Sequence, residues 1–258
     1  MRNRLEVSQI SRHFQELGQL QVDVAKRPIR RRKQVPICFC GPERYEQRYQ
    51  YPVIVWLHSC HSNETEIGNV MPVLSLQNYV ACAPRAPIAG EANGQRFLWG
   101  QSRAAIAIAE ESVFAAIEAA QERFSISRER VFLAGFGSGA TMAWRIALRY
   151  PTEFAGVVAA CGKFPQQHVP LVNYNCLSQV PTLWMYGADS SACGVDHVCQ
   201  SLPIMHAARL SVDIRQYPCR DELLSNMLSD ANSWMMGLVT KQSSPSVEQS
   251  CETSFSNN

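Results

Sequence analysis

The sequence predicts one α/β domain whose mostly parallel central sheet is covered by helices on both faces. The chain has 258 residues, which is long enough for one large domain of this class and short for two. Hydrophobic residues make up 46% of the chain and charged residues 18%, as is usual in proteins that bury a sheet. Short β-rich runs alternate with longer segments of helical periodicity, and this alternation is typical of parallel sheets.

Six runs are expected to form the strands of this sheet. Most of them are almost continuously apolar, as strands buried on both faces are. They are Val53–Leu57, Tyr79–Ala83, Val131–Ala134, Ala155–Ala160, Thr182–Tyr186 and Val212–Tyr217. Two shorter segments, Leu20–Val24 and Pro36–Phe39, are expected to add edge strands.

Five segments between these runs have the periodicity of helices that cover a sheet. They are Ile67–Leu76, Ser102–Phe124, Ser138–Arg149, His197–Leu210 and Glu222–Leu238. The sequence contains no internal repeat, so a single core is expected.

The two ends of the chain differ in composition from the part between them. Residues 1–33 carry nine Lys or Arg against three acidic residues, which leaves 15 against 19 in the rest. We interpret residues 1–34 as a basic segment, partly disordered or forming an edge strand. A run such as Lys26–Lys33 is more often a solvated connector than a nucleic-acid site. Residues 35–240 are expected to form the folded domain, and the Ser-rich residues 241–258 a disordered tail.

The location expected from the sequence is the cytoplasm. No run of about 18 or more apolar residues occurs, so no transmembrane helix is expected. The N-terminus lacks the apolar stretch of a secretory signal. The ten cysteines are therefore expected to be reduced, most of them as small buried side chains.

A strand, a glycine-rich turn and an alanine-rich helix follow one another without spare residues in Val131–Arg149. This order is typical of a nucleophile elbow. The residue at its apex has a strained backbone, and glycines two positions to either side let strand and helix pack closely. Gly135 and Gly139 occupy those two positions and place Gly137 at the apex.

In an alternative register the apex is Ser138, flanked by Phe136 and Ala140. Phe136 would then stand where a bulky side chain is crowded out. A simpler role for Ser138 is that of a small polar residue in the first helical turn, where its hydroxyl can serve free backbone N–H groups.

The elbow segment LAGFGSGATMAWRIAL is similar to that of the phospholipase/carboxylesterase family of α/β-hydrolases, which includes lysophospholipases and acyl-protein thioesterases. YPVIVWLHSCHSNE resembles the family's strand and oxyanion loop, and VMPVLSLQNYVACAPRAP its next helix and strand. PTLWMYGAD resembles the acid strand, and VDIRQYPCRDEL the histidine loop before a closing helix, here DANSWMM. The resemblance runs in order from Tyr51 to Leu238 and implies an α/β-hydrolase fold.

The same resemblance places the family's catalytic triad at positions that no longer carry it. Gly137 stands where the family has its nucleophilic serine. Matching YPCRDEL to the family's Tyr-Pro-Gly-Gly-His-Glu-Leu puts Asp221 in place of the base, and a carboxylate of ordinary pKa is a poor proton acceptor for an alcohol. The family's acid follows its strand as Gly-x-x-Asp, whereas Asp189 arrives one residue early and is a vestigial acid.

The loop that aims N–H groups at the oxyanion is altered as well. The family's His-Gly-x-Gly reads here His58-Ser59-Cys60-His61. Losing both glycines restricts the backbone bends of the loop. These four residues are the candidate binding residues of the cleft. Trp99 is expected to form a cleft wall, since loops at strand ends carry the ligand contacts in open α/β sheets. Trp56 and Trp144 are expected in the core.

The residues of this cleft suggest two other chemistries. A dyad of His61 and Ser138 would need His61 to border the elbow. A metal site would draw on His58, Cys60, His61, Asp189 and Asp221, but their spacing matches no closed zinc pattern. No metal and no cofactor is expected.

These substitutions predict a pseudoenzyme of the α/β-hydrolase fold, without serine-hydrolase catalysis, that binds something at the vestigial cleft. The ligand would be a small acyl or ester compound, or a protein partner would bind instead; nucleic acid is not expected. The alternative is a weak carboxylic-ester or thioester hydrolase that uses Ser138.

Overall fold

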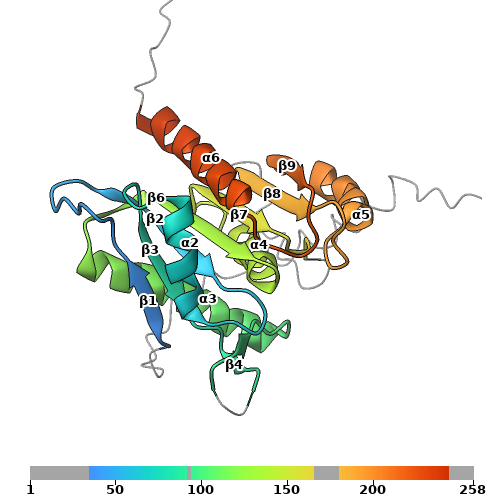
Figure 1. Cartoon of the computed structure of the whole chain (residues 1–258), viewed down its shortest axis with the longest axis horizontal. Helices are drawn as coiled ribbons and strands as arrows, with labels where there is room; N and C mark the ends of the chain where they lie inside the picture. The colour runs from blue at the N-terminus through green and yellow to red at the C-terminus, as the bar shows by residue number, and fades with distance from the viewer. Residues whose placement is uncertain (1–34, 92–93, 166–179, 244–258) are drawn as a thin grey trace, which may run out of the picture. The chain divides into compact units, whose positions relative to one another are not determined.

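The computed structural model describes residues 35–91, 94–165 and 180–243, and a seven-stranded sheet forms its centre (Figure 1). The strand order is β1-β3-β2-β6-β7-β8-β9. β1 pairs antiparallel with β3, and the other neighbours in this order are parallel. The strands are β1 (Ile37–Cys40), β2 (Tyr51–Leu57), β3 (Val80–Pro84), β6 (Ile126–Phe136), β7 (Gly156–Ala160), β8 (Thr182–Gly187) and β9 (Val212–Tyr217).

The predicted α/β class is therefore confirmed, and each of the six predicted runs overlaps a strand; β3 and β7 begin one residue later than predicted, at Val80 and Gly156. The apolar runs are central: every residue of β2, β3, β7 and β8 is buried. The expected edge segment Pro36–Phe39 corresponds to β1, which begins one residue later. Leu20–Val24 and the rest of the basic segment lie outside the described residues, as do residues 244–258.

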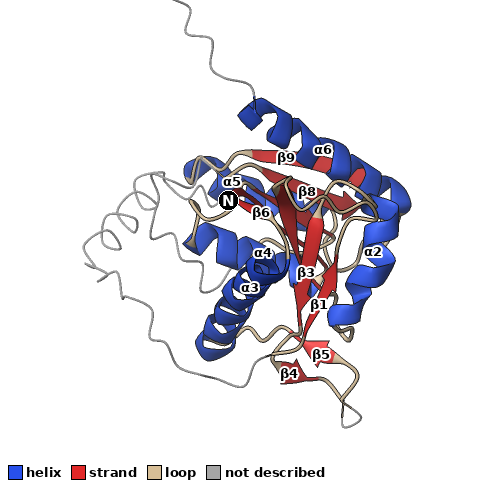
Figure 2. Ribbon diagram, turned by 90° about the vertical axis from the view of Figure 1, so that its left-hand side faces the viewer, coloured by secondary structure: helices blue, strands red, loops and turns tan. Residues whose placement is uncertain are grey.

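Helices cover both faces of the sheet (Figure 2). On one face α2 and α6 share a core with β2 and β6 residues such as Ile54 and Phe132. On the other face α3 and α4 pack on Val53 and Val55, and α5 joins α4 around Trp184. The helices are α2 (Ile67–Leu74), α3 (Arg103–Arg123), α4 (Ser138–Arg149), α5 (Val195–Ala207) and α6 (Ser225–Ser243), with a 3₁₀ turn, η1 (Glu64–Glu66). A small hairpin of β4 (Ile88–Ala89) and β5 (Phe97–Leu98) follows β3.

Two helices end earlier than their periodicity predicts, each for a local reason. α2 stops at Leu74 because Ser75 is extended and its hydroxyl accepts the N–H groups of Gln77 and Asn78. α5 begins two residues early, at Val195, and stops at Ala207. There Arg209 has φ 52°, and the next N–H reaches back to the Met205 carbonyl, which is a Schellman stop.

The last helix is shifted toward the C-terminus relative to its prediction. α6 begins at Ser225, because Glu222 remains in the preceding loop, where its carbonyl oxygen accepts the thiols of Cys161 and Cys219. It continues to Ser243 and so takes in the first residues of the segment expected to be a tail. None of the helices in the described ranges is both long enough and apolar enough to cross a membrane.

Candidate functional site

Gly137 forms the turn between β6, which ends at Phe136, and α4, which begins at Ser138. Its backbone has φ 57° and ψ −117°, a region that glycine enters at little cost and other residues avoid. The N–H of Gly137 donates to the Ala160 carbonyl at 2.8 Å, which fixes the turn at the carboxyl end of β7. The predicted strand–turn–helix therefore carries the sharp turn of a nucleophile elbow at Gly137.

The two flanking glycines allow β6, α4 and β2 to approach one another. A Cβ on Gly135 would lie 2.7 Å from the Gly139 carbonyl carbon and 2.8 Å from the Leu57 oxygen. A Cβ on Gly139 would overlap the Leu57 carbonyl and come within 2.5 Å of the His58 oxygen. By contrast, a Cβ on Gly137 would have no heavy atom within 4 Å. The apex has room for a side chain, and its flanks do not.

Ser138, the alternative nucleophile, is the first residue of α4. Its hydroxyl oxygen is buried and has no hydrogen-bond partner among the described residues. No histidine in that part of the chain therefore forms the contact that activates a serine.

Asp221 hydrogen-bonds to the loop that follows β8. Its Oδ1 accepts the hydroxyl of Ser190, and its Oδ2 accepts the Ser191 hydroxyl at 3.0 Å and the Ser191 N–H at 3.3 Å. The Ser190 hydrogen bond, followed by those of Ser191, holds the pKa of Asp221 below its ordinary value, although partial burial opposes this. Asp221 is thus a carboxylate at neutral pH.

Asp189 lies beside this pair without joining it. Its side chain is exposed, and its N–H donates to the Cys219 carbonyl at 3.1 Å. Ser190, which the sequence analysis did not select, is the residue of this loop that meets Asp221. Counting three residues from Gly187 would have found it.

His58 lies beneath the loop after β2 rather than on its surface. The side chain is 0% exposed, and its Nε2 accepts the Ala86 N–H at 3.0 Å. Nδ1 therefore carries the proton and donates to the Ser59 carbonyl at 2.8 Å. Burial lowers the pKa of His58, so a neutral imidazole holds the loop against the segment that follows β3.

Trp99 is also buried, at 4% exposure, and packs on the His58 ring at a centroid distance of 5.2 Å. Its indole N–H donates to the His58 carbonyl at 2.8 Å. The two side chains hold the loop from below, which leaves its exposed part to carry any ligand contact. Trp56 and Trp144, each 1% exposed, lie in the core as predicted.

Glu66 supports the same loop from α2's side, a role the sequence analysis did not identify. Its carboxylate accepts the Trp56 indole N–H at 2.9 Å, and the N–H and hydroxyl of Ser59 at 3.1 and 2.6 Å. No local sequence pattern predicts a contact between Ser59 and Glu66, which lie seven residues apart. Only the fold brings them together.

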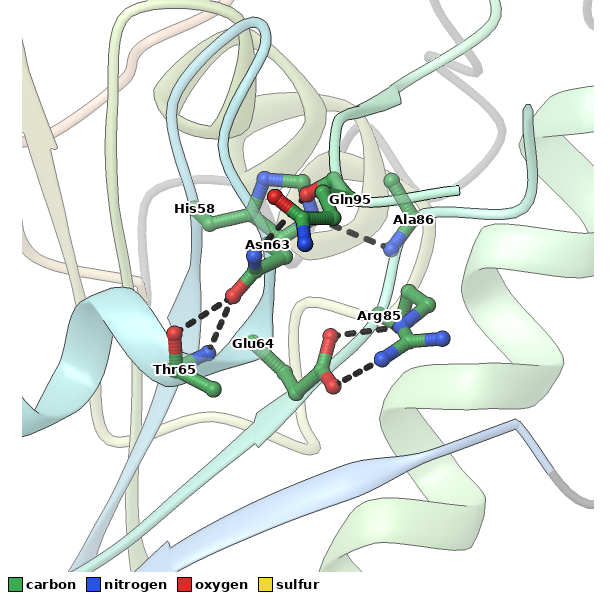
Figure 3. Close-up of polar contacts among 7 residues, drawn as sticks. All are labelled: His58, Asn63, Glu64, Thr65, Arg85, Ala86 and Gln95. Atoms are coloured by element: carbon green, nitrogen blue, oxygen red, sulfur yellow. Dashed lines mark hydrogen bonds and ion pairs between the residues drawn. The ribbon is translucent and has the colours of Figure 1, made fainter. Parts of the chain in front are cut away.

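A second set of contacts joins this loop to the residue after β3 and to the following hairpin (Figure 3). Arg85 Nε donates to Glu64 Oε2 at 2.6 Å, and its Nη2 pairs with the other oxygen. Asn63 Nδ2 donates to the Gln95 carbonyl at 2.9 Å. The side chains of Asn63 and Glu64 thus join the loop after β2 to two segments that lie further along the sequence.

The tip of the loop, Cys60 and His61, is exposed. His61 has φ 60°, so it adopts the left-handed conformation that the family's second glycine would provide. The expected loss of this bend is therefore not seen at His61. Within the described ranges, no group of three or more His, Cys, Asp or Glu residues is arranged to hold a metal ion.

Residues 93–237 match the model of the phospholipase/carboxylesterase family, which is more than half of the chain. The chain belongs to this family. No curated protein sequence matches it significantly.

Solved structures with the same fold include a carboxylesterase and an acyl-protein thioesterase. A carboxylesterase from Mesorhizobium loti has 18% identity and a TM-score of 0.66 over 81% of this chain and 98% of its own. Zea mays acyl-protein thioesterase 2 has 17% identity and a TM-score of 0.62 over 80% and 99%. Arabidopsis thaliana SOBER1 has 19% identity and a TM-score of 0.59 over 73% and 99%. At these identities the likeness establishes the α/β-hydrolase fold.

The phospholipase/carboxylesterase pattern gives the contacts of Asp221 a further meaning. Gly-x-x-Asp places the family's acid at Ser190, and the histidine loop places its base at Asp221. The hydrogen bond that would join acid and base in a working member joins these two residues here. Ser190 and Asp221 thus lie in contact at the two positions that the resemblance assigns to the acid and the base.

We expect Gly137→Ser to destabilise the protein. Serine would pay a backbone strain of about 1–3 kcal/mol that glycine avoids, while the open space around the Cβ adds no clash. The midpoint of thermal unfolding should fall by about 2–12 °C. Gly68→Ser is the control, since Gly68 lies in α2 with no heavy atom within 4 Å of a Cβ. An equal or higher midpoint for Gly137→Ser would contradict a strained apex.

Proposed function

We propose that this member of the phospholipase/carboxylesterase family has lost serine-hydrolase catalysis and binds a ligand or a partner at the vestigial cleft. The observation that carries the proposal is glycine at the elbow apex. Gly137 has the strained backbone of a nucleophile position and no side chain with which to attack. A hydrolase of this type needs a nucleophile there, because the elbow is what exposes it to the substrate.

The residue at the base position supports the same proposal. A general base acts best with a pKa near the working pH, whereas hydrogen bonds lower the pKa of Asp221 from an already acidic value. Its oxygens accept hydrogen bonds from the hydroxyls of Ser190 and Ser191. This arrangement suits a structural tie between two loops better than proton abstraction.

Parts of the cleft that would hold a carbonyl oxygen remain. The N–H of the residue after the apex is one oxyanion donor of this fold, and Ser138 N–H, at the start of α4, has no intrahelical acceptor. The loop bend at His61 is also kept. A small acyl or ester ligand that presents an oxygen to these groups fits the proposal; a protein partner is the other candidate. A cytoplasmic location belongs to the same proposal.

We expect no turnover of p-nitrophenyl acetate or butyrate above a denatured control, and no labelling by a fluorophosphonate probe. The apex has no hydroxyl, and the Ser138 hydroxyl is buried without a base in the described residues. Because these esters are not consumed, they also serve as ligand probes. A bound ester should raise the midpoint of thermal unfolding by an amount that grows with the ratio of ester concentration to Kd.

Ser138→Ala is the control variant for this experiment. Saturable hydrolysis or probe labelling that disappears in Ser138→Ala would refute the proposal and establish the alternative, a weak ester or thioester hydrolase. Hydrolysis that survives in Ser138→Ala would refute both.

A further inference from the structure

The sheet ends at β9, which pairs with β8 on one side. Thr182 N–H donates to the Ser211 carbonyl and Ala188 N–H to the Tyr217 carbonyl. In a parallel ladder, the residues that bond to the neighbouring strand alternate. The odd-numbered residues of this stretch therefore face β8, and the even-numbered ones turn their N–H and C=O groups to the open edge.

Three residues, Val212, Ile214 and Gln216, present these backbone groups. None of the three has a backbone partner at that edge within the described ranges. β9 contains no proline, glycine or bulge, which are common devices that keep an edge strand from pairing. Ile214 is 37% exposed and lies at the middle of the stretch. The edge is thus open to another strand.

The side chains of β9 are self-complementary in one antiparallel register. If Ile214 lies opposite itself, Val212 lies opposite Gln216, and all three outward-facing residues fall in hydrogen-bonded pairs. Asp213 then lies opposite Arg215 twice, in the non-hydrogen-bonded pairs where side chains are closest. A shift by one residue would lose both the hydrogen bonds and the charge pairing.

Helix α6 holds both charges on one face of the strand. Trp234 Nε1 donates to Asp213 Oδ2 at 2.6 Å, and Arg215 Nη1 lies 3.3 Å from Asp230 Oδ2. The Trp234 contact uses one oxygen of Asp213, and the Asp230 contact uses one nitrogen of Arg215. The other carboxylate oxygen of Asp213 and the remaining guanidinium N–H groups of Arg215 can therefore interact with a second strand. The opposite edge, β1, is shorter and uncharged, with the sequence ICFC.

We propose that β9 pairs antiparallel with β9 of a second copy of this chain, about a two-fold axis through Ile214. The two sheets then form one continuous sheet. An axis perpendicular to the sheet leaves α6 of both copies on the same face. This interface is independent of the vestigial cleft and of its proposed function.

Sedimentation velocity over a concentration series tests the pairing, and we expect a dimer for the unaltered chain. Ile214→Lys places like charges against each other at the axis and should weaken the dimer by at least about tenfold. Asp213→Arg and Arg215→Asp should each do the same. The double variant Asp213→Arg/Arg215→Asp restores opposite charges and should recover the dimer. Glu122→Arg, on the exposed face of α3, is the control and should leave it unchanged.

Two results would overturn this inference. One is a monomer at all concentrations. The other is a dimer that Ile214→Lys and the single charge reversals leave intact, since that dimer would use another surface. Thermal unfolding of each variant shows that it is folded. If a single reversal fails to fold, recovery of the dimer in the charge-swapped double variant decides the question, and a folded double variant that stays monomeric counts against the pairing.

Discussion

Gly139→Ala is expected to lower the free energy of unfolding strongly, although it adds only one methyl group. The new Cβ would overlap the Leu57 carbonyl and come within 2.5 Å of the His58 oxygen. Both neighbours are backbone atoms of β2 and its loop, so relief requires α4 to move away from the sheet. Overpacking that forces backbone shifts costs about 3 kcal/mol or more. The midpoint of thermal unfolding should fall by about 6–12 °C or more.

Gly68→Ala is the matched control, because Gly68 occupies the first turn of α2 as Gly139 occupies that of α4. No heavy atom lies within 4 Å of a Cβ at Gly68. Alanine there should raise stability by about 0.5–1 kcal/mol through helix propensity. If calorimetry gave Gly139→Ala the midpoint of Gly68→Ala, the close approach of α4 to β2 would be wrong.

Much of the fold could be predicted from the sequence because buried strands and tight turns restrict which residues can occupy them. A strand buried on both faces must be apolar throughout, so β2, β3, β7 and β8 were recognisable as runs. The spacing of Gly135, Gly137 and Gly139 carries the elbow, because each glycine meets a backbone requirement that few other residues can meet. Helix ends were less predictable, since they depend on single capping contacts such as those of Ser75.

The proposed site could be predicted where the family pattern fixes a position, and less well where it depends on contacts between loops. Gly137 and Asp221 followed from the family pattern alone. The family spacing marks position 190, three residues after Gly187, but the aspartate one residue earlier drew the prediction to Asp189; only the packed loops show that the Ser190 hydroxyl bonds to Asp221. His58 and Trp99 looked like cleft residues because they lie on loops at strand ends, but both are buried and hydrogen-bonded beneath the loop.

Restoring the complete triad, with Gly137→Ser, Ser190→Asp and Asp221→His together, is expected to give measurable ester hydrolysis. The hydrogen bond between Ser190 and Asp221 shows that side chains at these two positions reach each other. An aspartate and a histidine there can therefore form the orienting contact of a triad. The apex has open space for the serine, and the bend at His61 is already in place.

Variants that restore only part of the triad should hydrolyse esters much more slowly than the triple variant, because triad members act as a unit. Gly137→Ser alone should stay at the background rate, since Asp221 cannot take the proton. Gly137→Ser/Asp221→His lacks the orienting acid and should be slower than the triple variant by a factor on the order of 10²–10⁴. Gly137→Ala/Ser190→Asp/Asp221→His is the control without a nucleophile and should be inactive.

The pH dependence separates a restored triad from adventitious hydrolysis. The new histidine must be neutral to accept the serine proton, and its unperturbed pKa is about 6.5. A neighbouring aspartate stabilises the charged imidazole and raises that pKa, so initial rates should rise with pH through about 6.5 or slightly above. Rates are compared at equal folded concentration. If Gly137→Ser alone matched the triple variant, a working base would already be present, and the interpretation of Asp221 as a lost base would be refuted.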